Sequence, residues 1–258
     1  MEKRKVELNG GLVKSHADEH AFLKLPPTAT GYANAQIDDY GFIQNGRFSS
    51  RKNYPWQQGT RMRLRACFSH PADELKGTAG FGFWNAPWGD PTIRGFALPQ
   101  AAWFFCASPP NHLPFAPAEP GHGWFAATMD AATSHALLLL PIAPLLLLLN
   151  QPSNWHRRLW PKMQHRLGIS HANIQAPMQT WHNYELVWQR DKCIFKIDEE
   201  VVLQTRYSPK GPLGFVCWID NQFLVATANG RFQWGTLSTQ NTQWLEITDL
   251  QIQHLTQK

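Results

Sequence analysis

The nine residues TRMRLRACF, at positions 60–68, alternate strictly between two kinds of side chain. Positions 62, 64, 66 and 68 are apolar, whereas positions 61, 63 and 65 are all arginine. Because successive side chains of a strand point to opposite faces, this pattern predicts a strand with one face in a core and the other in water. Such alternation is typical of antiparallel sheets.

Similar short runs recur along the chain, separated by Gly, Pro, Asn and Asp. They predict strands at 78–85, 101–108, 123–130, 184–189, 193–198, 201–206, 213–220 and 244–252. The stretch CIFKIDEEVVLQT predicts a hairpin that turns near Asp198 and Glu199, although it lacks the usual glycine. No internal repeat interrupts this series, so we expect an all-β protein.

Composition agrees with a globular protein of this class. The chain has 258 residues, 43% of them hydrophobic and 17% charged, which suits a single β-sandwich domain over 1–258. Its start, MEKRKVELNGG, lacks the apolar segment of a signal peptide, so we expect a cytoplasmic protein. Four cysteines, at 67, 106, 193 and 217, lie far apart in apolar stretches, which favours reduced, buried thiols over a zinc site or a disulfide framework.

Two stretches of the sequence resemble the concanavalin A-like lectin and glucanase superfamily. One is LKGTAGFGFWNAPWGD (75–90), which leads into AAWFFCASPP (101–110). The other comprises WHNYELVWQRDKCIFKIDEEVVLQT (181–205), GPLGFVCWIDNQF (211–223) and WLEITDLQI (244–252), which look like the late strands of family-16-type glycoside hydrolases. The resemblance implies a concanavalin A-like jelly-roll β-sandwich whose concave sheet holds the ligand.

The chain departs from that family at its catalytic strand. Family-16 hydrolases carry a Glu-x-Asp-x-x-Glu motif there, because retaining hydrolysis needs two carboxyl groups about 5–5.5 Å apart. The counterpart here, AAWFFCAS (101–108), has no carboxylate on either face. Either Ala101, Trp103 and Phe105 or the alternate residues face the ligand, and neither set supplies an acid. The family's hydrolytic machinery therefore has no counterpart in this chain.

Tryptophan is unusually abundant, with twelve residues. Several lie on or beside the strands that the resemblance places in the concave sheet, where an indole ring can stack on a sugar or a flat apolar ligand. The alternative is a large aromatic core. The predicted ligand-binding residues are Trp84, Asn85, Trp88, Trp103, Phe105, Trp124, Trp218, Asp220 and Asn221.

Asp220 is the acid that the sequence singles out. It follows an apolar strand, and alternation places it on the same face as Trp218. Burial there would raise its pKa and suit it to act as a general acid or base, so it is the predicted catalytic residue. The alternative is a turn residue at the end of a strand, capped by Asn221.

No cofactor is predicted from the motifs. The histidines show no paired spacing with a carboxylate, so we expect no metal site among them. The resemblance allows a structural calcium with Asp249 as the type of residue involved, but no second ligand can be identified. The sequence has neither a Gly-rich phosphate loop nor a nucleophile elbow. Nucleic acid is not an expected partner, and the oligomeric state stays open.

Residues 135–175 predict an insert between strands. The run ALLLLPIAPLLLLLN (136–150) holds fourteen apolar residues, counting prolines at 141 and 144, and is too short to span a bilayer. After it, Trp155, Leu159, Met163 and Leu167 recur at helical spacing, opposite a basic face. Pro161 would kink or split this helix, and Gly168 can end it. No Asp or Glu occurs from 131 to 184.

Three interpretations of the insert stay open: a part of the core, a flap over the ligand, or an anchor on an anionic membrane surface. The residues assigned to a lid or membrane contact are Leu139, Leu146, Leu148, Trp155, Arg157, Arg158, Leu159, Lys162, Met163 and Arg166. For the whole protein we expect non-hydrolytic binding of a glycan, glycolipid or other amphipathic ligand, with possible attachment to the membrane periphery. The alternative is an enzyme, a cyclase, isomerase or atypical glycosidase, that uses Asp220.

Overall fold

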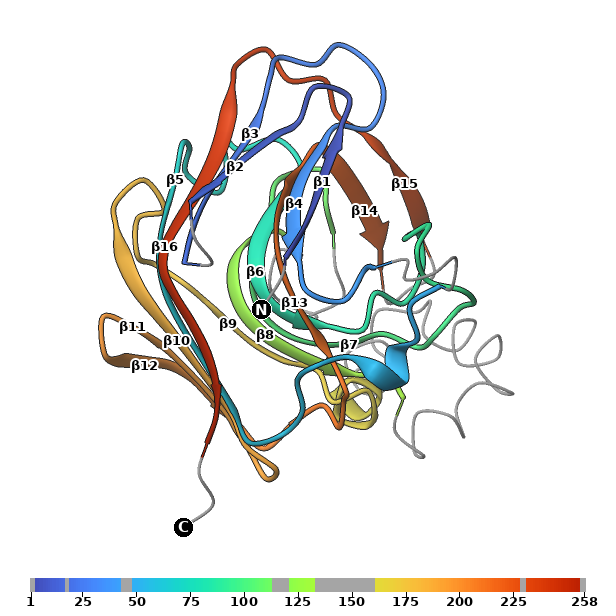
Figure 1. The fold of residues 1–258 in the computed structure, drawn as a ribbon, viewed down its shortest axis with the longest axis vertical. Helices are drawn as coiled ribbons and strands as arrows, with labels where there is room; N and C mark the ends of the chain where they lie inside the picture. Colours follow the sequence, from blue (N-terminus) through green and yellow to red (C-terminus); the bar gives the residue numbers. More distant parts are fainter. Residues whose placement is uncertain are drawn as a thin grey trace.

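The computed structural model describes residues 3–16, 19–42, 48–112, 121–132, 161–227 and 231–255. Two antiparallel sheets dominate it (Figure 1). Sheet A has the order β1 (Arg4–Leu8), β4 (Asn34–Asp38), β13 (Gly214–Asp220), β6 (Thr78–Trp84), β7 (Gln100–Ala107), β8 (Gly123–Asp130) and β9 (Ser170–Asn173). Sheet B has the order β12 (Glu200–Thr205), β11 (Cys193–Ile197), β10 (His182–Trp188), β5 (Thr60–Phe68), β16 (Gln243–His254), β3 (His20–Leu25) and β2 (Leu12–His16).

The chain passes repeatedly between the two sheets, as in a jelly roll. β5 lies in sheet B, β6 to β9 in sheet A, β10 to β12 in sheet B, β13 in sheet A and β16 in sheet B. A two-stranded sheet of β14 (Gln222–Ala226) and β15 (Phe232–Thr236) follows β13. A 3-10 helix spans Arg51–Asn53, and residues 161–166 are helical. The predicted all-β jelly-roll sandwich is therefore confirmed.

The main core lies between the sheets and is rich in aromatic rings. Phe104 of β7 packs against Tyr184 and Phe195 of sheet B, with ring centroids 5.1 and 5.3 Å apart. Phe81 of β6 lies 5.0 Å from Tyr184. The apolar positions of β5 also face this core, while its arginines face outward, as the alternation predicts.

All the strands predicted from the sequence, from 60–68 to 244–252, are present, and each predicted end lies within two residues of the observed one. The hairpin at 198–199 is confirmed as well: both turn residues have positive φ, 48° and 68°, the left-handed geometry that a tight hairpin requires. The sequence did not predict β1 to β4, β9, β14 or β15. These strands are four to six residues long, and their mixed polarity gives a weak pattern.

The four cysteines are free and buried, as predicted. Of the predicted insert at 135–175, residues 161–166 are helical, and Gly168 follows them with a φ of 58°, whereas residues 170–173 form β9 and belong to sheet A. The conformation of Gly168 ends a helix and favours glycine. The leucine run and residues 151–160 lie outside the described residues.

Candidate binding face

Sheet A carries a second apolar cluster on the side that faces away from sheet B. In Figure 1, β6, β7 and β8 curve around this side. We call Trp84, Trp103, Phe105 and Trp218 the outer aromatic face. Neighbouring ring centroids in it lie between 5.4 and 5.9 Å apart. Trp84 and Trp103 remain partly exposed.

Two glycines of β6 allow these rings to meet. Gly80 lies between Trp218 and Phe105 in the sheet register. A Cβ atom on Gly80 would lie 2.2 Å from the carbonyl oxygen of Phe104 and 3.1 Å from the Trp218 ring. A Cβ atom on Gly82 would lie 2.6 Å from the backbone of β7. Any larger residue would therefore displace the rings or the neighbouring strand, which explains the GFGF sequence of this strand.

Asp220 lies at one end of the outer aromatic face, on the face that alternation predicted. Its Oδ1 accepts hydrogen bonds from the Thr78 hydroxyl at 2.8 Å and from the Gln222 backbone N–H at 3.1 Å. The Tyr32 hydroxyl donates to Oδ2 at 3.3 Å. The indole N–H of Trp218 donates to the Thr78 hydroxyl oxygen at 2.9 Å, so the acid and the aromatic ring are coupled.

Asp220 is 5% exposed. Burial raises the pKa of its carboxyl group to about 6, although the hydrogen bonds that it accepts favour the charged form and lower the pKa. An acid with such a pKa exchanges its proton readily near neutral pH. The protonation state of Asp220 is thus set by its surroundings rather than by direct contact with water.

A charged cluster that the sequence did not predict lies on the same side of sheet A. Arg4 of β1 donates to Asp38 of β4 at 2.7 Å and also pairs with Asp90. Gln36 donates to the same Asp38 oxygen at 2.8 Å. The sequence pattern Asn34-Ala-Gln36-Ile-Asp38 could have indicated this cluster, because alternation places its three polar side chains on one face of a strand.

Asp220 is too far from Asp38 to form a glycosidase pair with it, and Asp90, the third acid on this side, lies beside Asp38 on the same Arg4 guanidinium. Asp38 opposes Val216, whereas Asp220 lies four residues further along the same strand, β13. The separation along the strand is therefore about 13 Å. Retaining glycosidases need about 5–5.5 Å and inverting ones about 6.5–9.5 Å between carboxyl groups. Asp38 is moreover fully buried and occupied by Arg4.

The loop from 85 to 99 is braced at the opposite end of the aromatic face. The Arg51 guanidinium donates to the carbonyl oxygens of residues 85, 86, 87, 94 and 95 at distances of 2.7 to 3.2 Å. Trp88 and Phe96 stack on this loop, with ring centroids 5.8 Å apart and planes 11° from parallel. Both are exposed. A rigid loop thus presents a flat apolar surface to the solvent.

Three of the predicted ligand-binding residues lie elsewhere. Trp124 points into the main core and packs against Phe68. On β8 the outward-facing residues are Phe125 and Ala127, and the side chains between them face the core. Asn85 bonds to the backbone of residues 98 and 100 and closes the 85–99 loop. Asn221 is fully buried, and its amide bonds to the backbone of residues 31, 33 and 237. These amides stabilise turns, since buried polar groups need partners.

Only part of the predicted lid or membrane segment is described. Lys162 and Arg166 are exposed, and Met163 is half-buried. Leu167, from the predicted apolar ridge, packs against the same apolar cluster as Trp84 and Trp103. Seven residues with this assignment lie outside the described ranges: Leu139, Leu146, Leu148, Trp155, Arg157, Arg158 and Leu159. Among the described residues, no helix is long and apolar enough to cross a membrane.

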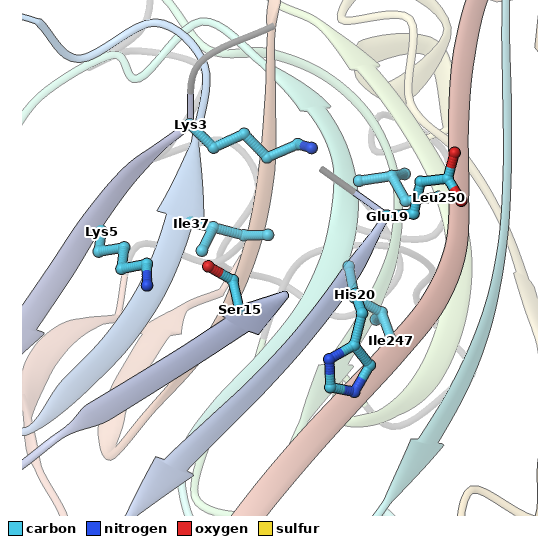
Figure 2. A pocket seen from close by; sticks show the side chains of 8 residues that line it. All are labelled: Lys3, Lys5, Ser15, Glu19, His20, Ile37, Ile247 and Leu250. Carbon is cyan, nitrogen blue, oxygen red and sulfur yellow. The ribbon is translucent and has the colours of Figure 1, made fainter. Parts of the chain in front are cut away.

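A separate cavity of about 60 Å³ lies at the edge of the sandwich, between β1, β2, β3 and β16. Figure 2 shows Lys3, Lys5 and Ser15 on one side of it and Glu19 and His20 on the other. Its volume suits a few water molecules rather than a sugar ring. Within the described ranges, no group of three His, Cys, Asp or Glu residues is arranged to hold a metal ion.

No protein-family model matches the sequence, and no curated protein matches it. Similar solved structures include the carbohydrate recognition domain of Emp47p, with 10% identity, coverage of 98% of this chain and 89% of that chain, and a TM-score of 0.47. Alginate lyase AlyC3 has 10% identity, coverage of 92% and 75%, and a TM-score of 0.45. An endo-β-galactosidase from Clostridium perfringens that releases GlcNAcα1-4Gal has 10% identity, coverage of 92% and 53%, and a TM-score of 0.45. At these values the similarities carry no information about activity.

Proposed function

We propose that this protein is a concanavalin A-like module that binds a glycan, free or as part of a glycolipid, on the outer aromatic face of sheet A, without hydrolysing it. The observation that carries the proposal is the set of four contiguous rings on a sheet face that does not face the core. Aromatic rings stack on the C–H faces of sugars, and the adjacent Asp220, Thr78 and Gln36 side chains supply the few polar groups that orient a ligand.

The braced loop supports a ligand longer than one sugar. Trp88 and Phe96 lie beyond the Trp84 end of the aromatic face, while Asp220 lies near the Trp218 end. Residues 214 and 220, which pair with the two ends of β6, are about 20 Å apart along β13. An extended oligosaccharide would contact both ends at once.

A substitution of Trp103 tests this proposal on a glycan array. Trp103 is central to the aromatic face and touches Trp84, Phe105 and Trp218. We expect Trp103→Ala to remove binding to every glycan that the wild-type protein captures, while circular dichroism stays unchanged. Trp181→Ala, at an exposed tryptophan of the other sheet, is the matched control and should bind normally. Equal binding by the Trp103 variant would contradict the proposal.

An enzymatic role for Asp220 is the second candidate, favoured by its burial beside Trp218 and its pKa of about 6. The 13 Å separation from Asp38 argues against ordinary hydrolysis, so we expect no turnover of laminarin or lichenan. A cyclase, isomerase or atypical glycosidase would need only one such acid. If array ligands are converted, Asp220→Asn should abolish the conversion and retain binding; robust endo-hydrolysis of β-glucans would contradict our assignment of the acids.

A further inference from the structure

The β14–β15 hairpin exposes aromatic side chains on one of its two faces. Leu224 opposes Trp234, and Phe232 lies two residues before Trp234, so these three share a face. Phe232 is 70% exposed and Trp234 is 69% exposed. At the other end of the same face, Gln222 opposes Thr236. The face is thus polar near sheet A and aromatic at the end next to Arg231.

The body of the protein holds this hairpin in place. The Leu224 N–H donates to the Asn111 side-chain oxygen at 2.8 Å, and the Leu224 carbonyl accepts from His112 at 3.0 Å. On the opposite face, Phe223 lies over Gly235, where a Cβ atom would approach the ring to 2.8 Å. An isolated two-stranded ribbon is marginally stable in water, so these contacts fix the exposed rings in position.

The charge of the hairpin indicates what it contacts. Arg231 is the one charged residue between Asn221 and Leu245 in the sequence, and it directly precedes Phe232. Exposed aromatic residues next to a cation and without acids suit the headgroup region of a bilayer, where indole rings partition and arginine meets anionic lipids. A sugar stacked on these rings would have the Arg231 guanidinium as a nearby donor, but the neutral polar side chains of this face, Gln222 and Thr236, lie at its other end.

We infer that the β14–β15 hairpin docks on anionic membrane surfaces, with Phe232 and Trp234 entering the headgroup layer and Arg231 pairing with lipid phosphate or carboxylate groups. In Figure 1, β15 runs along the upper right margin of the molecule, apart from sheet B. The inference does not depend on glycan binding, because it involves none of the residues of the outer aromatic face.

Vesicle co-sedimentation of the full chain tests this inference. Wild-type protein should sediment with vesicles of equal parts phosphatidylcholine and phosphatidylserine, less so with pure phosphatidylcholine, and less at high salt because screening weakens the Arg231 contact. Phe232→Ser combined with Trp234→Ser should lower the affinity at least about tenfold, since both rings leave the bilayer. Arg231→Gln should lower binding to the mixed vesicles only.

The matched control is Trp181→Ser combined with Val201→Ser. Both residues are exposed and apolar, but Trp181 directly precedes β10 and Val201 lies on β12, both strands of sheet B. This control should sediment as the wild type does. The inference is overturned if the wild type stays in the supernatant with both vesicles, or if the hairpin double variant sediments normally. Loss of binding only in Leu146→Asp with Leu148→Asp would assign the contact to the leucine run instead. Loss of glycan-array binding by the hairpin variant, with normal sedimentation, would assign the hairpin to the glycan.

Discussion

The outer faces of the two sheets differ in chemistry although the sheets have the same number of strands. Sheet B presents charged side chains: Glu185 of β10 pairs with Arg61 and Arg63 of β5 and with Lys196 of β11. Sheet A presents the outer aromatic face, with Trp103 and Trp218 at its centre. A two-layer sandwich needs one apolar face per sheet to form its core, and only sheet B follows that minimal pattern.

The aromatic side chains make the outer face of sheet A, rather than that of sheet B, the surface on which we expect a ligand. Of its four rings, Phe105 and Trp218 are buried and Trp84 and Trp103 are half-exposed. Apolar side chains that gather on a solvent-facing side of a domain commonly mark contact with a ligand or partner. One acid on each outer face illustrates the difference. Asp220 on sheet A is buried with a raised pKa, whereas the pKa of Glu185 on sheet B is lowered, because hydrogen bonds from Arg61 and Arg63 outweigh its partial burial. Both sheets contribute to the core between them, and the outer face of sheet A carries the candidate site.

The largest effect should come from the inner face of sheet A. Phe104 is fully buried and contacts the rings of Phe81, Trp124, Tyr184 and Phe195. We expect Phe104→Ala to lower the free energy of unfolding by about 3–5 kcal/mol, because it removes apolar burial and leaves a cavity between the sheets. Urea denaturation measures this change. The neighbouring Trp103→Ala, on the outer face, should lose far less stability, and equal losses would break the distinction between the faces.

A buried acid of the interior should produce the next largest effect. Asp39 accepts hydrogen bonds from the Trp56 indole at 2.6 Å and from the Phe215 N–H at 2.8 Å, and burial raises its pKa to about 7. A carboxyl group whose pKa is higher in the folded than in the unfolded state binds its proton more tightly when folded. Its contribution to stability is therefore present at low pH and is lost as the pH rises from about 4 to about 7.

Wild-type protein should accordingly lose on the order of 3 kcal/mol of stability from this group over that interval, and Asp39→Asn should flatten the profile. Denaturant midpoints at pH 4.5 and 7.5 would measure it. Asp220 adds a smaller change of the same sign up to about pH 6. The groups with lowered pKa, such as Asp90, act below about pH 4 and leave this window unaffected. Stability that rose with pH in both proteins would contradict the assignment.

The same contrast explains what the sequence could predict. On β5, arginine alternates with apolar residues, so the strand and its inner face follow directly from the pattern. On β7, both faces are apolar: Phe104 lies in the core and Trp103 on the outer face. Alternation locates such a strand but cannot tell its two faces apart. This ambiguity is the reason that the sequence placed Trp124 with the ligand-binding residues.

The charged cluster beside the aromatic face could not be predicted from the sequence, for a different reason. Arg4, Asp38 and Asp90 come from three distant segments that meet only through the order of sheet A. Nothing local to any of them indicates the others. Asp220 was predictable because its own strand sets both its burial and its face. Its partners Thr78 and Tyr32 come from other strands and loops, so its pKa became known only with the fold.

The smallest expected effect lies on the charged face of sheet B. The Arg63 side chain is 44% exposed, and its guanidinium Nε lies 2.5 Å from a Glu185 oxygen. Such a pair gains little in water, because solvent and salt screen it. Glu185 also keeps Arg61 at 2.8 Å and Lys196 at 3.6 Å when Arg63 is removed. We therefore expect Arg63→Gln to lower the free energy of unfolding by about 0.5 kcal/mol, with a difference that shrinks at high salt.

Glu185→Gln should have the larger effect, since it leaves three cations close together without their shared acid. Urea denaturation at low and high salt compares the two variants. If Arg63→Gln instead matched the loss of Phe104→Ala, the charged face would be part of the stabilising core, and the contrast between the two sheets would fail.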